Sequence, residues 1–117
     1  MPQFLILLRD NGTRSAAQDD RQQRMQRYGA WTESLRQGGH LAGANKLRDG
    51  EGRVVRRDSS EMVVTDGPFV ETKEILGGYY LITADTYEQA IELTRDCPHY
   101  DYGSVEVREV EDLGRRG

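Results

Sequence analysis

Apolar runs separated by short polar stretches predict the order of strands and helices along the chain. Phe4 to Leu8 is continuously apolar and favours a central strand covered on both faces. After a polar break at residues 10–12, apolar side chains recur at helical spacing at Met25, Tyr28, Trp31 and Leu35. We therefore predict a first helix of roughly five turns that stops at Gly38 and Gly39.

The middle of the chain carries weaker strand patterns. Residues 41–47 indicate a second strand, and the polar, glycine-rich residues 49–52 indicate a turn after it. Val54 and Val55 then face the apolar residues 62–64 across the polar residues 58–60, which predicts a hairpin. We expect this hairpin to be an appendage to the core.

Two further strands are predicted in the last part of the chain. Gly77 and Gly78 open a strand at residues 79–83, which is rich in β-branched and aromatic side chains. Val105, Val107 and Val110 indicate a last strand before a polar tail at residues 114–117.

A second helix is predicted between these two strands. Either Asp85 with Glu88 or Thr86 with Gln89 forms its capping pair, and Pro98 ends it. The residues expected on its inner face are Tyr87, Ala90, Ile91 and Thr94.

The resulting order is strand, helix, strand, inserted hairpin, strand, helix, strand. This order predicts the split βαβ pattern of a ferredoxin-like α+β sandwich. Two helices cover only one face of such a sheet, so a second copy of the chain is expected to cover the other face. We predict a homodimer that forms an α/β barrel, with a cavity between the sheets or beside each helix.

Composition narrows the class of protein. The 117 residues fit one domain, at residues 1–113. With 20 acidic and 16 basic residues, the net charge of −4 argues against a nucleic-acid partner. The apolar N-terminal run ends at Arg9, so neither a membrane segment nor a signal peptide is expected. Cys97 is the only cysteine, which excludes an internal disulfide and favours a partly buried thiol in the cytosol.

Three short motifs carry a resemblance to a known family: DGPF at residues 66–69, ETKE at 71–74 and GGYY at 77–80. With them the chain resembles the DGPF group of YCII-related proteins. Similarity at residues 28–33, 97–98 and 103–108 extends this resemblance over nearly the whole chain. The resemblance implies a ferredoxin-like dimeric α/β barrel of unsettled activity in bacteria. It also implies genes beside extracytoplasmic-function sigma factors.

The broader YCII group suggests a catalytic pair, a histidine on the first helix and an aspartate near the end of the second. In this chain Tyr28 stands at the histidine position, and Cys97, before Pro98, stands at the aspartate position. An imidazole exchanges protons near pH 7, whereas an unperturbed tyrosine has a pKa of about 10. The pair suggested by the family is therefore not carried over.

Candidate ligand-binding residues come from the first helix, the DGPF loop and the end of the second helix. They are Tyr28, Trp31, Asp66, Phe69, Thr72, Lys73 and His99. Residues 66–68 form a turn on one interpretation, and on the other they present Asp66 and Phe69 to a ligand. Lys73 beside carboxylates suits anion binding better than nucleophilic chemistry. Tyr28 is interpreted either as a core residue with a bonded hydroxyl or as part of a pocket edge.

The two histidines, His40 and His99, lack the spacing of metal ligands, so neither a metal nor a cofactor is expected. His99 lies close in sequence to Cys97 and Asp101, which leaves a Cys-His or a His-Asp contact open.

Three functions remain open from the sequence. The first is a domain that binds or transforms a small organic molecule by metal-independent acid/base chemistry, of the isomerase or lyase type. The second is a non-catalytic regulatory dimer linked to a sigma factor, with Asp19, Asp20 and Glu33 as a contact surface. The third is a structural role in which the motifs specify only the dimer.

Overall fold

A computed structural model describes residues 1–10, 21–48, 51–66 and 75–112. The predicted order of elements is confirmed over these residues. The elements are β1 (Gln3–Asp10), α1 (Arg21–Gln37), β2 (Leu41–Lys46), β3 (Arg53–Asp58), β4 (Glu61–Asp66), β5 (Ile75–Thr83), α2 (Tyr87–Leu93), the 3₁₀ helix η2 (Pro98–Asp101) and β6 (Gly103–Glu109).

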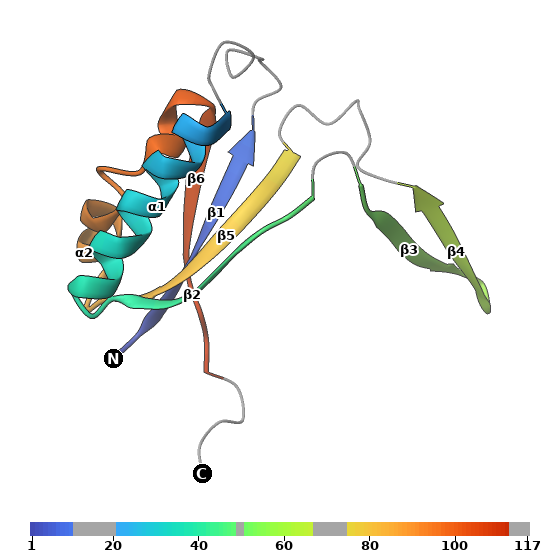
Figure 1. Cartoon of the computed structure of the whole chain (residues 1–117). Coiled ribbons are helices and arrows are strands. Elements are labelled where there is room, and N and C mark those ends of the chain that lie inside the picture. The colour runs from blue at the N-terminus through green and yellow to red at the C-terminus, as the bar shows by residue number, and fades with distance from the viewer. Residues whose placement is uncertain (11–20, 49–50, 67–74, 113–117) are drawn as a thin grey trace.

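Four strands form an antiparallel sheet in the order β2-β5-β1-β6. The helices α1 and α2 lie together on one face of this sheet (Figure 1). The result is the α+β class that the sequence predicts, with a ferredoxin-like order of elements. We call this sheet with its helices the body.

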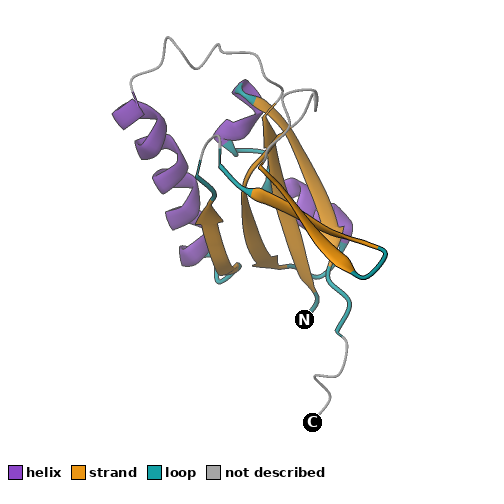
Figure 2. Cartoon of the chain, turned by 90° about the vertical axis from the view of Figure 1, so that its right-hand side faces the viewer, coloured by secondary structure: helices purple, strands orange, loops and turns teal. Residues whose placement is uncertain are grey.

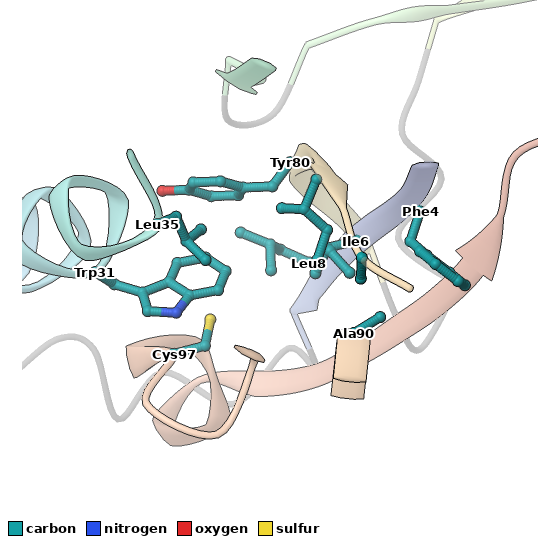
Figure 3. Packing of buried hydrophobic residues seen from close by; sticks show 10 residues of the cluster. Phe4, Ile6, Leu8, Trp31, Leu35, Tyr80, Ala90 and Cys97 are labelled. Atoms are coloured by element: carbon teal, nitrogen blue, oxygen red, sulfur yellow. The ribbon is translucent and has the colours of Figure 1, made fainter. Parts of the chain in front are cut away.

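The core lies between the sheet and the helices. Phe4, Ile6 and Leu8 of β1 are buried at every second position, as expected for one face of a strand. They meet Trp31 of α1 and Tyr80 of β5, whose rings lie 4.5 Å apart between centroids (Figure 3). Burying a large apolar side chain contributes about 1.5–3 kcal/mol, so this cluster supplies much of the stability of the body.

The first helix ends as predicted, at its two glycines. Gly39 has φ +78°, and the amide of His40 donates to the carbonyl of Leu35 while the amide of Gly39 donates to that of Arg36. This is a Schellman motif, in which a left-handed residue ends the helix and its last carbonyls find donors.

The inner stripe of α1 differs from the predicted one at Met25, which is 66% exposed. Tyr28 is half-buried, and Trp31 and Leu35 are buried as predicted. Extended toward the start of the helix in steps of three and four residues, the stripe reaches Arg24. The sequence pattern placed Met25 on the inner face of α1 because it is apolar. In the helix, the inner face instead carries the residue four positions before Tyr28, which is Arg24.

The second helix starts with the second of the two predicted capping pairs, because the Thr86 hydroxyl accepts from the amide of Gln89 at 3.1 Å. The prediction that Pro98 ends this helix was wrong, since α2 stops at Leu93 and Pro98 begins η2.

The inner face of α2 was only partly predicted. Ala90 and Thr94 are buried, whereas Tyr87 and Ile91 are 43% and 54% exposed. A helix of two turns presents few positions to a sheet, and within α2 the buried residue is Ala90. Val110, assigned to the last strand, lies just beyond β6 and is 39% exposed.

The predicted hairpin is confirmed as β3 and β4, which form a separate two-stranded sheet. We call it the arm. It projects from the body on the side away from α1 and α2 (Figures 1 and 2). Four of its five large apolar side chains are 43% exposed or more, namely Val54, Val55, Met62 and Val64, and the fifth, Val63, is half-buried. The radius of gyration is 16.4 Å, against about 13 Å for a compact domain of this length.

The face of the sheet opposite the helices is uncovered by any described residue of the body. It carries the alternate residues of β1 and β5, including Leu5, Leu7, Tyr79 and Leu81, which are half-buried. Among the helices that the structure describes, none is long and apolar enough to cross a membrane.

Candidate functional site

The apolar rows of two elements turn polar at the same end of the core. On β1 the inward row Phe4, Ile6 and Leu8 continues to Asp10, the last residue of the strand. On α1 the inward stripe reaches Tyr28 and then Arg24 toward the start of the helix. Because β1 ends where α1 starts (Figure 1), these polar side chains gather at one end of the core.

Glycines bring the backbones together at this end. A Cβ atom on Gly103 would overlap the carbonyl oxygen of Arg9, so only glycine permits this approach of β6 to β1. The pairing of β1 with β5 shifts between Leu8 and Arg9, opposite Gly77, which forms a β-bulge. A Cβ atom on Gly77 would lie 3.3 Å from a carboxylate oxygen of Asp10, so this glycine leaves room for that side chain.

His99, which lies in η2, contacts both Asp10 of β1 and Tyr28 of α1. It is 3% exposed, and its Nδ1 lies 2.7 Å from the hydroxyl oxygen of Tyr28. Its Nε2 lies 3.0 Å from the carbonyl oxygen of Arg9 and 3.4 Å from Oδ1 of Asp10. Tyr28, His99 and Asp10 thus form a continuous chain of contacts, which we call the relay.

The hydrogen bonds assign the proton on the imidazole of His99. Burial lowers the pKa of His99, although the Arg9 carbonyl and the Asp10 charge oppose this shift, so the ring is neutral at pH 7. A carbonyl oxygen only accepts hydrogen bonds, so Nε2 carries the hydrogen and donates to Arg9. Nδ1 is then a bare acceptor, and the Tyr28 hydroxyl donates to it.

The state of Tyr28 agrees with this assignment. Burial raises the pKa of Tyr28 to about 12, although a hydrogen bond from Arg24 and its positive charge act in the opposite direction. The phenol therefore keeps its proton at neutral pH. Tyr28 is a hydroxyl donor poised against a neutral imidazole, the arrangement of an acid/base pair.

Asp10 completes the relay with an atom that is not otherwise satisfied. Its Oδ1 is buried and has no hydrogen bond with any residue that the structure describes. Buried polar atoms nearly always have partners, so an orphaned carboxylate oxygen beside an imidazole calls for an explanation. A carboxylate in this position favours the positively charged form of the ring and thereby offsets part of the effect of burial.

Trp31, predicted to line a ligand site, is a core residue in the structure. It is 4% exposed, and its indole nitrogen donates to the carbonyl of Leu93 at 3.0 Å. Cys97 is buried beneath it, as the sequence predicts (Figure 3). Burial raises the pKa of the Cys97 thiol to about 11, so this cysteine is a protonated packing residue rather than a nucleophile.

Of the DGPF candidates, Asp66 lies within the described residues, and it does not join the relay. Asp66 ends β4 in the arm, its side chain is 87% exposed, and it pairs with Arg53 at 3.2 Å. Phe69, Thr72 and Lys73 lie outside the described residues, so their roles stay predictions.

Of the sequence candidates, Tyr28 and His99 are brought together, and two further residues were missed. The His-Asp contact left open for Asp101 is made by Asp10 instead, because Asp101 pairs with Arg27 at 2.6 Å. The alternation of β1 carried one step further would have placed Asp10 on the inner face. Arg24 would have followed from the helical stripe traced back one turn from Tyr28.

The fold and the relay define an α+β domain with a buried acid/base cluster at one end of its core. The chain belongs to the family of YCII-related domains, since the model of that family matches residues 3–113. It is also 42% identical over 57 residues to "Uncharacterized protein R00369" of Rhizobium meliloti (strain 1021). That match covers 47% of this chain and 46% of the relative, so it spans about half the length of each protein.

Proposed function

We propose that this YCII-related domain transfers protons to and from a small organic molecule, with the relay as its acid/base group. One observation carries the proposal: the 2.7 Å contact between the Tyr28 hydroxyl and Nδ1 of a neutral, buried His99. A structural role alone would be served by any hydrogen bond to the hydroxyl of Tyr28. It would not call for a carboxylate oxygen, without a described hydrogen-bond partner, on the far side of the ring.

The proton path follows from the assigned hydrogen bonds. As Tyr28 accepts a proton from the substrate, its own hydroxyl proton moves to Nδ1 of His99. The ring then carries both N–H groups and one positive charge, which the Asp10 carboxylate stabilises. The electron pair of the broken bond stays on the substrate. Return of the proton to another atom gives an isomerisation, and departure of a leaving group with an electron pair gives an elimination.

We further propose that the working form is a homodimer with the geometry of an α/β barrel. The support is the uncovered face of the sheet, where Leu5, Leu7 and Leu81 present half-buried apolar side chains. A second copy meeting this face would bury them. Analytical ultracentrifugation is expected to find a dimer that Leu7→Lys converts to monomer. A wild-type chain that sediments as a monomer at micromolar concentration contradicts the barrel.

Exchange of carbon-bound hydrogen tests the proton-transfer function. The full chain is incubated in D2O with a panel of small carbon acids, and deuterium uptake is followed by NMR. For compounds that take up deuterium with the wild-type protein, we expect Tyr28→Phe and His99→Gln to lower the rate of uptake by a factor of about 10²–10⁴. Tyr100→Phe is the matched control, because among the described residues it removes a hydroxyl that bonds only to the neutral Thr94.

Two results would overturn the function. One is the absence of uptake with every compound in the panel, and the other is a Tyr28→Phe rate equal to wild type. The ¹⁵N spectrum of His99 gives a test free of substrate, since we expect a protonated Nε2 and an unprotonated Nδ1 at pH 7.

The alternative of a regulatory dimer linked to a sigma factor stays a prediction. Its proposed contact surface includes Glu33, which is paired with Arg36 of the same helix at 2.7 Å. Asp19 and Asp20 lie outside the described residues. Copurification with a sigma factor, together with no uptake in the exchange experiment, would favour this alternative.

A further inference from the structure

Two arginines of α1 near the relay have different partners. Arg27 pairs with Asp101 at 2.6 Å and also donates to the Tyr102 hydroxyl. Over the described residues, no carboxylate lies within ion-pair distance of Arg24. Among the described residues, the positive charge of Arg27 is therefore paired and that of Arg24 is not.

The guanidinium of Arg24 is held in place by aromatic rings. It lies 3.9 Å from the ring centroid of Tyr102, which is 4% exposed, and 5.9 Å from that of Tyr28. Stacking on a fixed ring immobilises the plane of the guanidinium and costs none of its donors, which point outward in that plane. Tyr28 lies one helical turn after Arg24, on the same face of α1. Arg24 is thus a preorganised fork beside the atom that receives the proton.

The charge of Arg24 acts on both proton carriers. It lowers the pKa of Tyr28 and, more weakly than burial does, that of His99. A positive charge in this position also stabilises negative charge that develops on a substrate as its proton leaves.

We propose that Arg24 binds the carboxylate of the substrate, so that the relay acts on a small organic monoanion. The inference rests on the proposed proton-transfer function. A planar carboxylate matches the guanidinium fork in a bidentate manner. Asp10 already places one negative charge behind His99, and Arg24 is one cation without an ion pair among the described residues, so a monoanion suits this place better than a dianion such as phosphate. The acidic hydrogen of the substrate lies next to the carboxylate, within reach of Tyr28.

The test uses benzoate as the probe, with benzamide as its uncharged match and inorganic phosphate as the dianion. Binding to the full chain is measured by calorimetric titration and by the shift of the thermal midpoint. We expect benzoate to bind, benzamide to give no shift, and phosphate to bind more weakly than benzoate. Arg24→Gln is expected to weaken benzoate by about tenfold or more, which corresponds to about 1.4 kcal/mol. Arg27→Gln is the control and should keep the wild-type affinity within about threefold.

Three results would overturn the inference. They are benzoate binding to wild type and Arg24→Gln with equal affinity, no binding of benzoate to wild type, and weaker binding of benzoate than of phosphate to wild type. The midpoint without ligand shows that each variant is folded. The two proposals fail separately. If only neutral carbon acids exchange their protons, the proposed anion site at Arg24 is contradicted and the proposed function of the relay is not. If benzoate binding depends on Arg24 but no compound exchanges its protons, the proton-transfer function of the relay is contradicted and the anion site is not.

Discussion

The body and the arm are both built from antiparallel strands, yet only the body buries its apolar side chains. Ile82 on β5 is 0% exposed, whereas Val64 on β4 is 60% exposed. Both lie in short runs rich in β-branched residues that predict strands. The difference arises from what covers each sheet, since helices lie on the body and nothing among the described residues covers the arm.

This contrast shows where a rigid site is available. A two-stranded hairpin alone is marginally stable in water, so side chains on the arm are poorly fixed unless a partner covers them. Tyr28, His99 and Asp10 lie at the end of the packed core, where their geometry is fixed by buried neighbours. Acid/base chemistry needs side chains that are held in a precise geometry, and the location of the relay in the body agrees with that need.

The largest expected effect compares one strand residue from each region. Ile82→Ala should destabilise the protein by about 2–5 kcal/mol, because it leaves a cavity in the core. Val64→Ala should change stability by less than about 0.5 kcal/mol, because its side chain is exposed. Urea unfolding at low protein concentration measures both. If Val64→Ala lowers the free energy of unfolding as much as Ile82→Ala does, the arm is covered in solution, and the two regions do not differ in burial.

A second prediction compares two glycines of the body. Gly103→Ala should cost about 2 kcal/mol or more, because the new Cβ overlaps the Arg9 carbonyl that holds His99. Gly29→Ala is the matched control, since nothing lies within 4 Å of a Cβ there, and it should stabilise α1 by about 0.5–1 kcal/mol. Thermal unfolding of the two variants gives the comparison. Equal effects would contradict the close approach of β6 to β1.

A third prediction concerns the pH dependence that the relay gives to the body. Burial lowers the pKa of His99 in the fold, so below pH 6.5 the unfolded chain takes up a proton that the folded chain does not. Stability from this residue is fully present above pH 6.5 and is lost as pH falls toward the folded pKa, with a slope of up to about 1.4 kcal/mol per pH unit.

Unfolding free energies of wild type and His99→Gln between pH 5 and pH 8 isolate this contribution, because every other titrating group is shared. The variant is expected to have the shallower slope over the acidic part of the range. Identical slopes would mean that His99 is not buried in its neutral form.

The smallest predicted effect lies at the end of α1, where Gly39 has φ +78°. Gly39→Ala should cost about 1 kcal/mol through backbone strain alone, since nothing lies within 4 Å of the added Cβ. Gly39→Asn should cost less, because asparagine tolerates the left-handed conformation. Chemical denaturation resolves the two. Reversal of this order would point to a side-chain contact rather than to strain.

Much of the fold was predictable because local patterns determine it. The continuous apolar run of β1, the stripe of α1 around Trp31 and the paired glycines after it each encode an element within a few residues. The errors fell where burial depends on neighbours distant in sequence. Met25 and Ile91 are apolar and lie in helices, yet both are exposed.

The site was predicted in part. Tyr28 and His99 were chosen for their chemistry, but their contact joins positions 71 residues apart and follows from no local spacing. Asp10 was interpreted only as part of the polar break after the first strand, because its role depends on where η2 places the imidazole ring of His99.

The sequence by itself determined the order of elements, the α+β class and the family, since periodicity, turn residues and short motifs are local properties of the chain. The tertiary structure alone decided that a tyrosine, a histidine and an aspartate from three separate elements meet behind an arginine. Their pKa values and proton positions depend on burial and on contacts across the fold, and those exist only after the chain has packed.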